Sequence, residues 1–421
     1  MNRRERTMTK DSVINVGLIG CGGIMHARLN GYKSLRDAGY DGVRIKALCD
    51  INPEGIRQYR CKSEGPGPRA AAGAFKHYYV DEIQPECVPE AYTDHREMLE
   101  KAGLDAVEVY TSDSTHHSLA IDCLNAGKHV MVEKPMAISV LAGKRMVEAA
   151  KKKGLVLATA HCFRFEEAIR ATRFVVEQGT LGALQVLSWC NVGRGDISKI
   201  KDRVSKAWRH SRLGTAGEAL ENGCHFMDTV RFMIGEVDEV LGRVETFEKI
   251  RREYDGNGNV VKEIENENTD SFFAIVRFEN GAVGQVSHVN NAHGEPLSPK
   301  PLGYGLYGSK GSIKNPELVL DDGTRASVVD ILEEKAPAEL KGQYFPLGMK
   351  NRYALEVHSF LEAIRDGREA EVSGEEGLRD IAASWAIVES SARGCAVKVD
   401  DVKSGAIADC QKEIDEHYGL S

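Results

Sequence analysis

The sequence lacks three features that would point to particular classes of protein. Its ten cysteines include no Cys-x-x-Cys pair, which argues against a zinc knuckle or disulfide scaffold and favours a reducing cytoplasm. Basic residues are not in excess, because 55 lysines and arginines stand against 63 acidic residues, so we expect no nucleic-acid partner. No window approaches the ~18 apolar residues that span a bilayer, so we expect no membrane partner. Arg3 and Arg4 precede no apolar export segment, and the expected location is cytoplasmic.

The 421 residues are enough for two or three domains, and the pattern of apolar segments divides them into two. As far as residue 160, strand-like segments alternate with helical ones, which predicts an α/β fold with a doubly wound parallel sheet. These segments are 13–19, 43–49, 105–110, 130–133 and 155–160. Beyond this point β-rich segments and hairpin signals such as Glu279-Asn280-Gly281 predict an α+β domain with a large mixed or antiparallel sheet. The expected domains are therefore 1–160 and 161–421.

A glycine-rich turn follows the first predicted strand at once. In such a turn the first glycine allows a tight bend, the second lets a pyrophosphate approach, and the next helix directs its amides at the phosphates. The second strand ends in Asp50, where dinucleotide folds bind the ribose hydroxyls, although Asp50 could equally cap the following helix. We therefore predict bound NAD. The residues expected to contact it here are Gly20, Gly22, Gly23, Ile24, Met25 and Asp50.

The segment Val130 to Pro135 places an acid and a base at the end of a buried strand. Ligands of open α/β sheets bind at the carboxyl ends of strands, so Glu133 and Lys134 are candidate contacts of the cofactor. The alternative is an exposed, weak ion pair. A polar loop expected after the strand ending at residue 110 adds Thr111 and His116 as cofactor contacts, with His116 alternatively a helix-start residue.

A second group of polar residues lies at 221–228. Glu221 and His225 are four residues apart, so on a helix they share one face, with Asp228 a turn further on. A carboxylate beside an imidazole can orient the ring and raise its basicity. A buried histidine satisfied by Glu221 remains an alternative. A metal site is not favoured, since no second His or Cys cluster appears.

These segments together resemble the glucose–fructose oxidoreductase, inositol dehydrogenase and rhizopine-catabolism (Gfo/Idh/MocA) family. The resemblance covers Val13 to about Val399 and depends on the Gly20 turn, on Gly127-Lys128-His129-Val130 before Glu133-Lys134-Pro135, and on the acid and histidine at 221 and 225. It implies that Lys134, Glu221 and His225 are the catalytic residues. Glu221 departs from the aspartate that is common in the family. The implied substrate contacts are Arg164, Trp208, Arg209 and His225.

The resemblance implies an NAD-dependent dehydrogenase that acts on a secondary hydroxyl of a sugar, a sugar derivative or a cyclitol. One alternative is a redox-neutral enzyme that retains NAD and cleaves glycosides by oxidation, elimination and reduction. Another is a non-catalytic sensor, against which the presence of Lys134, Glu221 and His225 argues. We expect a homodimer or homotetramer formed through the C-terminal sheet.

Overall fold

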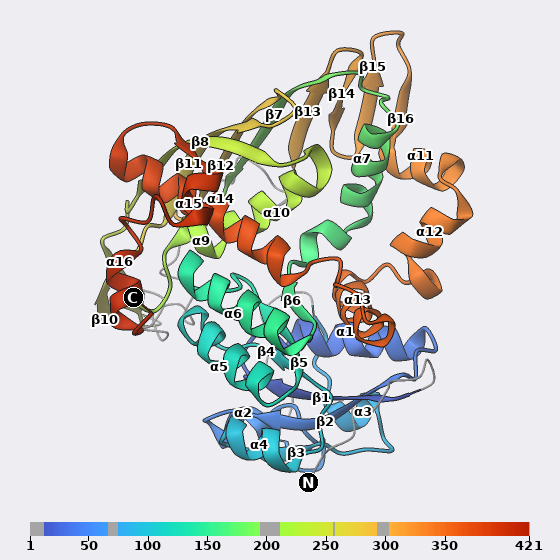
Figure 1. The fold of residues 1–421 in the computed structure, drawn as a ribbon, viewed down its shortest axis with the longest axis vertical. Helices are drawn as coiled ribbons and strands as arrows, with labels where there is room; N and C mark the ends of the chain where they lie inside the picture. The colour runs from blue at the N-terminus through green and yellow to red at the C-terminus, as the bar shows by residue number, and fades with distance from the viewer. Residues whose placement is uncertain (1–11, 66–74, 194–210, 256, 293–302, 421) are drawn as a thin grey trace.

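The computed structural model describes residues 12–65, 75–193, 211–255, 257–292 and 303–420, and two β-sheets organise them (Figure 1). The first sheet has six strands in the order β3-β2-β1-β4-β5-β6, and all its pairings are parallel. The strands are β1 (Ile14–Ile19), β2 (Val43–Cys49), β3 (Glu90–Tyr92), β4 (Ala106–Val109), β5 (His129–Glu133) and β6 (Leu157–Ala160). This topology confirms the predicted doubly wound parallel sheet.

Six helices connect or follow these strands: α1 (Met25–Asp37), α2 (Pro53–Arg57), α3 (Val80–Ile83), α4 (His95–Lys101), α5 (Asp113–Asn125) and α6 (Val140–Lys153). The ends of α6 follow ordinary capping chemistry. Ser139 accepts a hydrogen bond from the amide of Ala142 at the start of α6, and Gly154 ends that helix at φ 64°. The polar loop predicted after residue 110 is wrong, because α5 already begins at Asp113, an acid in the first helical turn.

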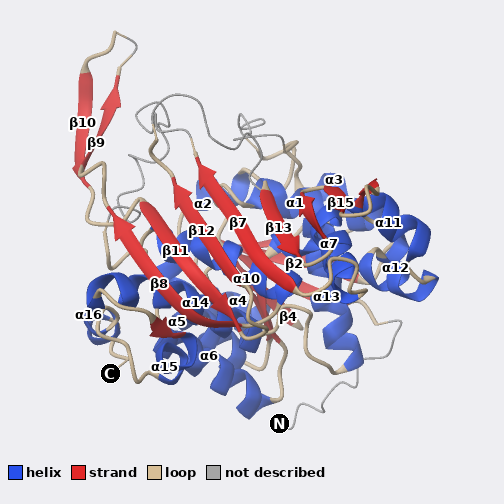
Figure 2. Ribbon diagram, turned by 90° about the horizontal axis from the view of Figure 1, so that it is seen from above, coloured by secondary structure: helices blue, strands red, loops and turns tan. Residues whose placement is uncertain are grey.

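The second sheet is mixed, as predicted, and has the order β16-β15-β14-β13-β7-β12-β11-β8-β17. Strands β7 and β12 pair in parallel, and the other neighbours pair antiparallel. Its strands are β7 (Leu184–Val192), β8 (Val237–Glu245), β11 (Ser271–Phe278), β12 (Val283–Val289), β13 (Tyr304–Gly308), β14 (Gly311–Lys314), β15 (Glu317–Leu320), β16 (Arg325–Ser327) and β17 (Val397–Lys398). A separate hairpin of β9 (Ile250–Tyr254) and β10 (Val260–Glu265) projects beyond the sheet (Figure 2).

Helices lie between the two sheets and cover one face of the second. They are η1 (Cys162–Phe165), α7 (Glu167–Glu177), α9 (Glu218–Glu221), α10 (Gly223–Ile234), α11 (Val328–Lys335), α12 (Ala338–Tyr344), η4 (Pro346–Gly348), α13 (Arg352–Asp366), α14 (Gly374–Arg393), α15 (Val399–Ser404) and α16 (Lys412–His417). Every residue of α10 is buried. Helix α14 packs on β8 and also contacts α6, and α13 packs on α1. Since these late helices contact the first layer, the division after residue 160 stays a prediction.

Figure 2 shows the opposite face of the second sheet, where β13, β7, β12, β11 and β8 lie in front of α10 and α14. Strand β11 alternates along its length: Phe273 and Ile275 are exposed on this face, while Phe272 and Val276 are buried against the helices. Within the described residues, no helix combines the length and the apolar character that crossing a bilayer requires.

Candidate functional site

The turn between β1 and α1 has the backbone that the glycine motif predicts. Gly20 has a φ of +95°, and a Cβ there would lie 2.6 Å from the carbonyl oxygen of Tyr110. Gly22 and Gly23 differ, because a Cβ on either would meet no atom within 4 Å. The open space beside these two glycines fits the approach of a pyrophosphate to the start of α1. Met25 contributes only its backbone, since its side chain is fully buried in the core, whereas Ile24 is half-buried.

Asp50 lies beside this turn at the end of β2. Its carboxylate accepts hydrogen bonds from the amide of Cys21 at 2.7 Å and from the amide of Asn52 at 2.8 Å. The alternative that Asp50 caps the next helix is wrong, because Asn52 is the N-cap of α2. Asp50 is half-exposed, which leaves its carboxylate accessible to a ribose diol. The glycine turn and Asp50 together fit a dinucleotide such as NAD.

Glu133 holds the backbone in front of Lys134 and is only 7% exposed. One of its oxygens accepts from the amide of Lys134 at 2.9 Å, and the other pairs with Arg28 of α1. Arg28 also pairs with Glu356 of α13. Both carboxylate oxygens of Glu133 are thus used inside the protein, and its expected contact with the cofactor stays a prediction. Glu133 thus connects α1, through Arg28, to the backbone of Lys134.

Lys134 bridges the two sheets. Its Nζ donates a hydrogen bond to the backbone oxygen of Glu221, at 2.8 Å, across 87 positions of sequence. Burial by itself would lower the pKa of Lys134, but Cys224, Glu221 and Asp113 act in the other direction, and the pKa is raised. Lys134 is therefore a cation at neutral pH.

Asp113 is an acid of this site that sequence reasoning missed. It is 6% exposed and accepts a hydrogen bond from the hydroxyl of Thr215 at 2.7 Å. Burial raises its pKa, and the neighbouring Glu221 raises it further. The one signal available was an acid directly after a parallel strand, within the segment expected to be a loop.

The spacing of Glu221 and His225 predicts one continuous helix, but the structure places the two residues in different helices. Glu221 ends α9, and α10 begins at Gly223 after the intervening Asn222. His225 is 8% exposed, and its ring stacks on Phe163 with centroids 4.4 Å apart. Burial lowers its pKa well below the ordinary value, and Lys134 and Arg352 lower it further. His225 is therefore neutral at physiological pH, and its surroundings do not favour the protonated ring that Glu221 was expected to stabilise.

The remaining predicted contacts have separate outcomes. His116 lies in α5, fully buried, with Nδ1 2.8 Å from the carbonyl oxygen of Pro135 and Nε2 3.2 Å from that of Thr111. It thus anchors the turn after Lys134, as its helix-start alternative suggests. Arg164 is 3% exposed and bound to Asp228, and its expected contact with substrate stays a prediction. Thr111 is half-buried beside the glycine turn, and Trp208 and Arg209 lie outside the described residues.

Comparison with known proteins places both parts of the chain in one family. Residues 14–161 match a family model described as an oxidoreductase family with an NAD-binding Rossmann fold, and residues 176–399 match its C-terminal alpha/beta domain. Myo-inositol 2-dehydrogenase of Thermotoga maritima is 26% identical over 396 residues, which are 92% of this chain and 99% of that protein. Levoglucosan dehydrogenase of Pseudarthrobacter phenanthrenivorans is 24% identical over 416 residues, which are 93% and 99% of the two chains.

Solved structures share the fold. The complex of levoglucosan dehydrogenase with NADH and L-sorbose superposes with a TM-score of 0.71 at 22% identity, covering 92% of this chain and 99% of that one. At that identity the likeness establishes the architecture, namely a parallel Rossmann sheet followed by a large mixed sheet.

Proposed function

Because the chain belongs to the Gfo/Idh/MocA oxidoreductase family, with its NAD-binding Rossmann fold, we propose that it transfers a hydride between NAD and a secondary hydroxyl group of a sugar, a sugar derivative or a cyclitol. The observation that carries the proposal is the contact of Lys134 Nζ with the Glu221 backbone, which joins the carboxyl end of β5 to the segment that holds His225. The names of the relatives, an inositol dehydrogenase and a levoglucosan dehydrogenase, support this substrate class.

The cofactor would be held by the turn at Gly20, Gly22 and Gly23 and by Asp50. Bound there, NAD supplies the hydride acceptor for alcohol oxidation. The chain's own residues would accept the hydroxyl proton and stabilise the negative charge that develops on the oxygen. Neutral His225 can accept the hydroxyl proton, and the Lys134 cation can stabilise the alkoxide that develops as the proton leaves. Asp113 and Glu221 balance the charge of Lys134.

The test is a panel of sugars and cyclitols with NAD⁺, followed by the absorbance of NADH. A substrate should appear in the panel, and Lys134→Met should lower its turnover by ~10²–10³-fold, the usual loss when one group that stabilises a developing negative charge is removed. The variant should still bind NADH, and Lys144→Met on the outer helix α6 serves as the control. If Lys134→Met retained near-normal turnover, the proposed role of Lys134 would be wrong.

We also propose an assembly and a location. The exposed apolar side chains of the second sheet support a homodimer or homotetramer formed through that face; they are Val186, Leu241, Phe273, Ile275, Val283 and Tyr307. All ten cysteines lie in the described residues and are free thiols, which supports a reducing cytoplasm.

A further inference from the structure

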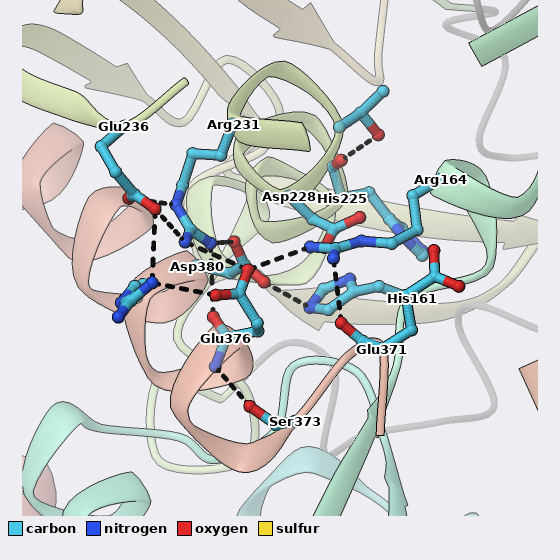
Figure 3. Close-up of polar contacts among 12 residues, drawn as sticks. His161, Arg164, His225, Asp228, Arg231, Glu236, Glu371, Ser373, Glu376 and Asp380 are labelled. Carbon is cyan, nitrogen blue, oxygen red and sulfur yellow. Dashed lines mark hydrogen bonds and ion pairs between the residues drawn. The ribbon is translucent and has the colours of Figure 1, made fainter. Parts of the chain in front are cut away.

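A buried polar cluster lies directly behind His225 (Figure 3). It consists of His161, which follows β6, Asp228 of α10 and Asp380 of α14, and we call it the buried trio. All three residues are fully buried. One ring nitrogen of His161 and one oxygen from each carboxylate lie within 4.8 Å of one another, and His161 Nε2 is 3.6 Å from Asp380 Oδ2.

Each aspartate of the trio uses one oxygen for an arginine. Arg164 Nε donates to Asp228 Oδ1 at 2.8 Å, and Arg231 pairs with Asp380 Oδ1. The other oxygen of each aspartate and both ring nitrogens of His161 are buried and have no hydrogen-bond partner within the described part of the chain. Buried polar atoms are normally paired, so unpaired atoms on three neighbouring side chains indicate that a hydrogen lies among them.

The charges around the trio favour a proton over a metal ion. Arg164 and Arg231 already place two positive charges beside the aspartates, and Glu376 contacts both arginines, at 3.4 and 3.2 Å. A divalent ion would face both guanidinium groups at close range. Two carboxylates this close in a dry interior cannot both stay ionised without cost, and one proton removes that cost. Within the described part of the chain, Lys134, Glu133, His225 and Cys224 also face the trio.

We propose that Asp380 holds one proton directed at His161, beside Asp228, and that this proton fixes His161 as a positioning residue for His225. The rings of His161 and His225 meet edge to face, with centroids 5.4 Å apart and planes at 77°. Burial raises the pKa of Asp380 well above its ordinary value, and Asp228 raises it further. Burial lowers the pKa of His161 to about 4, so the ring carries no charge. The proton stays in place during the reaction.

The proton can be detected without any activity. Because the pKa of Asp380 is raised on folding, the folded chain keeps a proton that the unfolded chain releases above about pH 4. The wild-type protein should therefore lose stability as the pH rises from there to the raised pKa, with a slope that corresponds to about one proton. Asp380→Asn carries a permanent hydrogen at the same place and should lose this component of the slope. The measurement is Tm against pH for the full chain.

Glu236→Gln is the matched control, because Glu236 also pairs with Arg231, at 2.8 Å, on the side away from His161 (Figure 3). It should keep the wild-type slope. Asp228→Asn removes the neighbouring charge and should flatten the slope as well, so it replaces Asp380→Asn should that variant fail to fold. Equal slopes in wild type and both aspartate variants would overturn the proposal, and so would stoichiometric zinc in the purified protein.

The role of His161 in positioning His225 rests on the proposed function. It is tested separately, by the kinetics of a His161 variant. His161→Gln should lower kcat about tenfold while leaving the KM for NAD unchanged, because a displaced His225 affects the reaction and not cofactor binding. A parallel rise in KM, or no change in kcat, would contradict it. If no substrate were found at all, the proposed function would fail, whereas the dependence of Tm on pH would still decide whether the proton is there.

Discussion

At the scale of single residues, burial and nearby cations keep the ring of His225 neutral. Arg352 is one of them, and its guanidinium lies 5.2 Å from the centre of the Phe163 ring on which His225 stacks. If neutral His225 accepts the proton, kcat/KM for oxidation should fall as the pH drops through its lowered pKa, below the ordinary value of about 6.5. Arg352→Gln removes a positive charge, so the pKa of His225 should rise. The acidic limb of the profile should move up by about one pH unit.

The control for this experiment is Arg368→Gln. It removes an exposed arginine just after α13, the helix that begins at Arg352. Its pH–rate profile should match that of the wild type. A limb that does not move in Arg352→Gln, while kcat/KM is otherwise retained, would show that another group accepts the proton.

Asp50 determines cofactor choice at the same scale. Its carboxylate faces the glycine turn, and two like charges within ~4 Å at an effective dielectric of 20 cost several kcal/mol, so a 2′-phosphate should be repelled. The nearby Arg57 is paired with Glu54 at 2.9 Å, and Arg60 is paired with Glu64, which reduces their value as phosphate partners. NAD should therefore be preferred to NADP, as kcat/KM with each cofactor would show. Equal values would contradict the assignment, and Asp50→Asn should narrow the difference.

Sequence reasoning could find residues whose neighbours in the chain reveal them. Lys134 follows a strand, and His225 has an acid four positions before it. Asp380 is different, because it lies 219 positions from His161, on a helix whose sequence marks its ends and its buried face but not its partner in space. Contacts of that range depend on how the two sheets pack, which one sequence does not determine.

At the scale of elements, the turn between β1 and α1 allows a sharp comparison of its glycines. Gly20→Ala should destabilise the protein, since φ is +95° and the new Cβ would lie 2.6 Å from a backbone oxygen. Gly22→Ala should keep the wild-type Tm, because its Cβ meets nothing within 4 Å, yet it should weaken NAD binding by occupying the space of the pyrophosphate. Thermal unfolding and NADH titration of both variants separate the two effects. Normal NADH affinity in Gly22→Ala would remove this turn from the cofactor site.

The order and type of most elements could be predicted, because apolar periodicity marks them directly. The segment after β4 could not, since Ser112 to His117 is polar throughout and its helical start has no apolar stripe. The break at Asn222 was also missed. The spacing of Glu221 and His225 suits one helix, and only the packing of α9 and α10 shows that two helices meet there.

At the scale of the whole molecule, the helices α13 and α14 join the two sheets. Helix α14 supplies Asp380 to the buried trio, and α13 supplies Glu356 to Arg28. The residues around Lys134 and His225 are thus held from both layers. The late helices therefore contribute supporting residues to a site whose candidate catalytic residues all lie within the first 225 residues.

The uncovered face of the second sheet leads to a prediction about assembly. Ile275 is 52% exposed at the middle of β11, opposite Leu241 of β8, which is 46% exposed. Apolar side chains that lie together on one face favour contact with a second apolar face, so a charge placed there should separate the subunits. Ile275→Glu should shift the protein to a smaller species in light scattering coupled to size exclusion. Val88→Glu, at an exposed apolar residue before β3, should leave the mass unchanged. A wild-type chain that is already monomeric at micromolar concentration, or an Ile275→Glu variant with wild-type mass, would rule out this face as the interface.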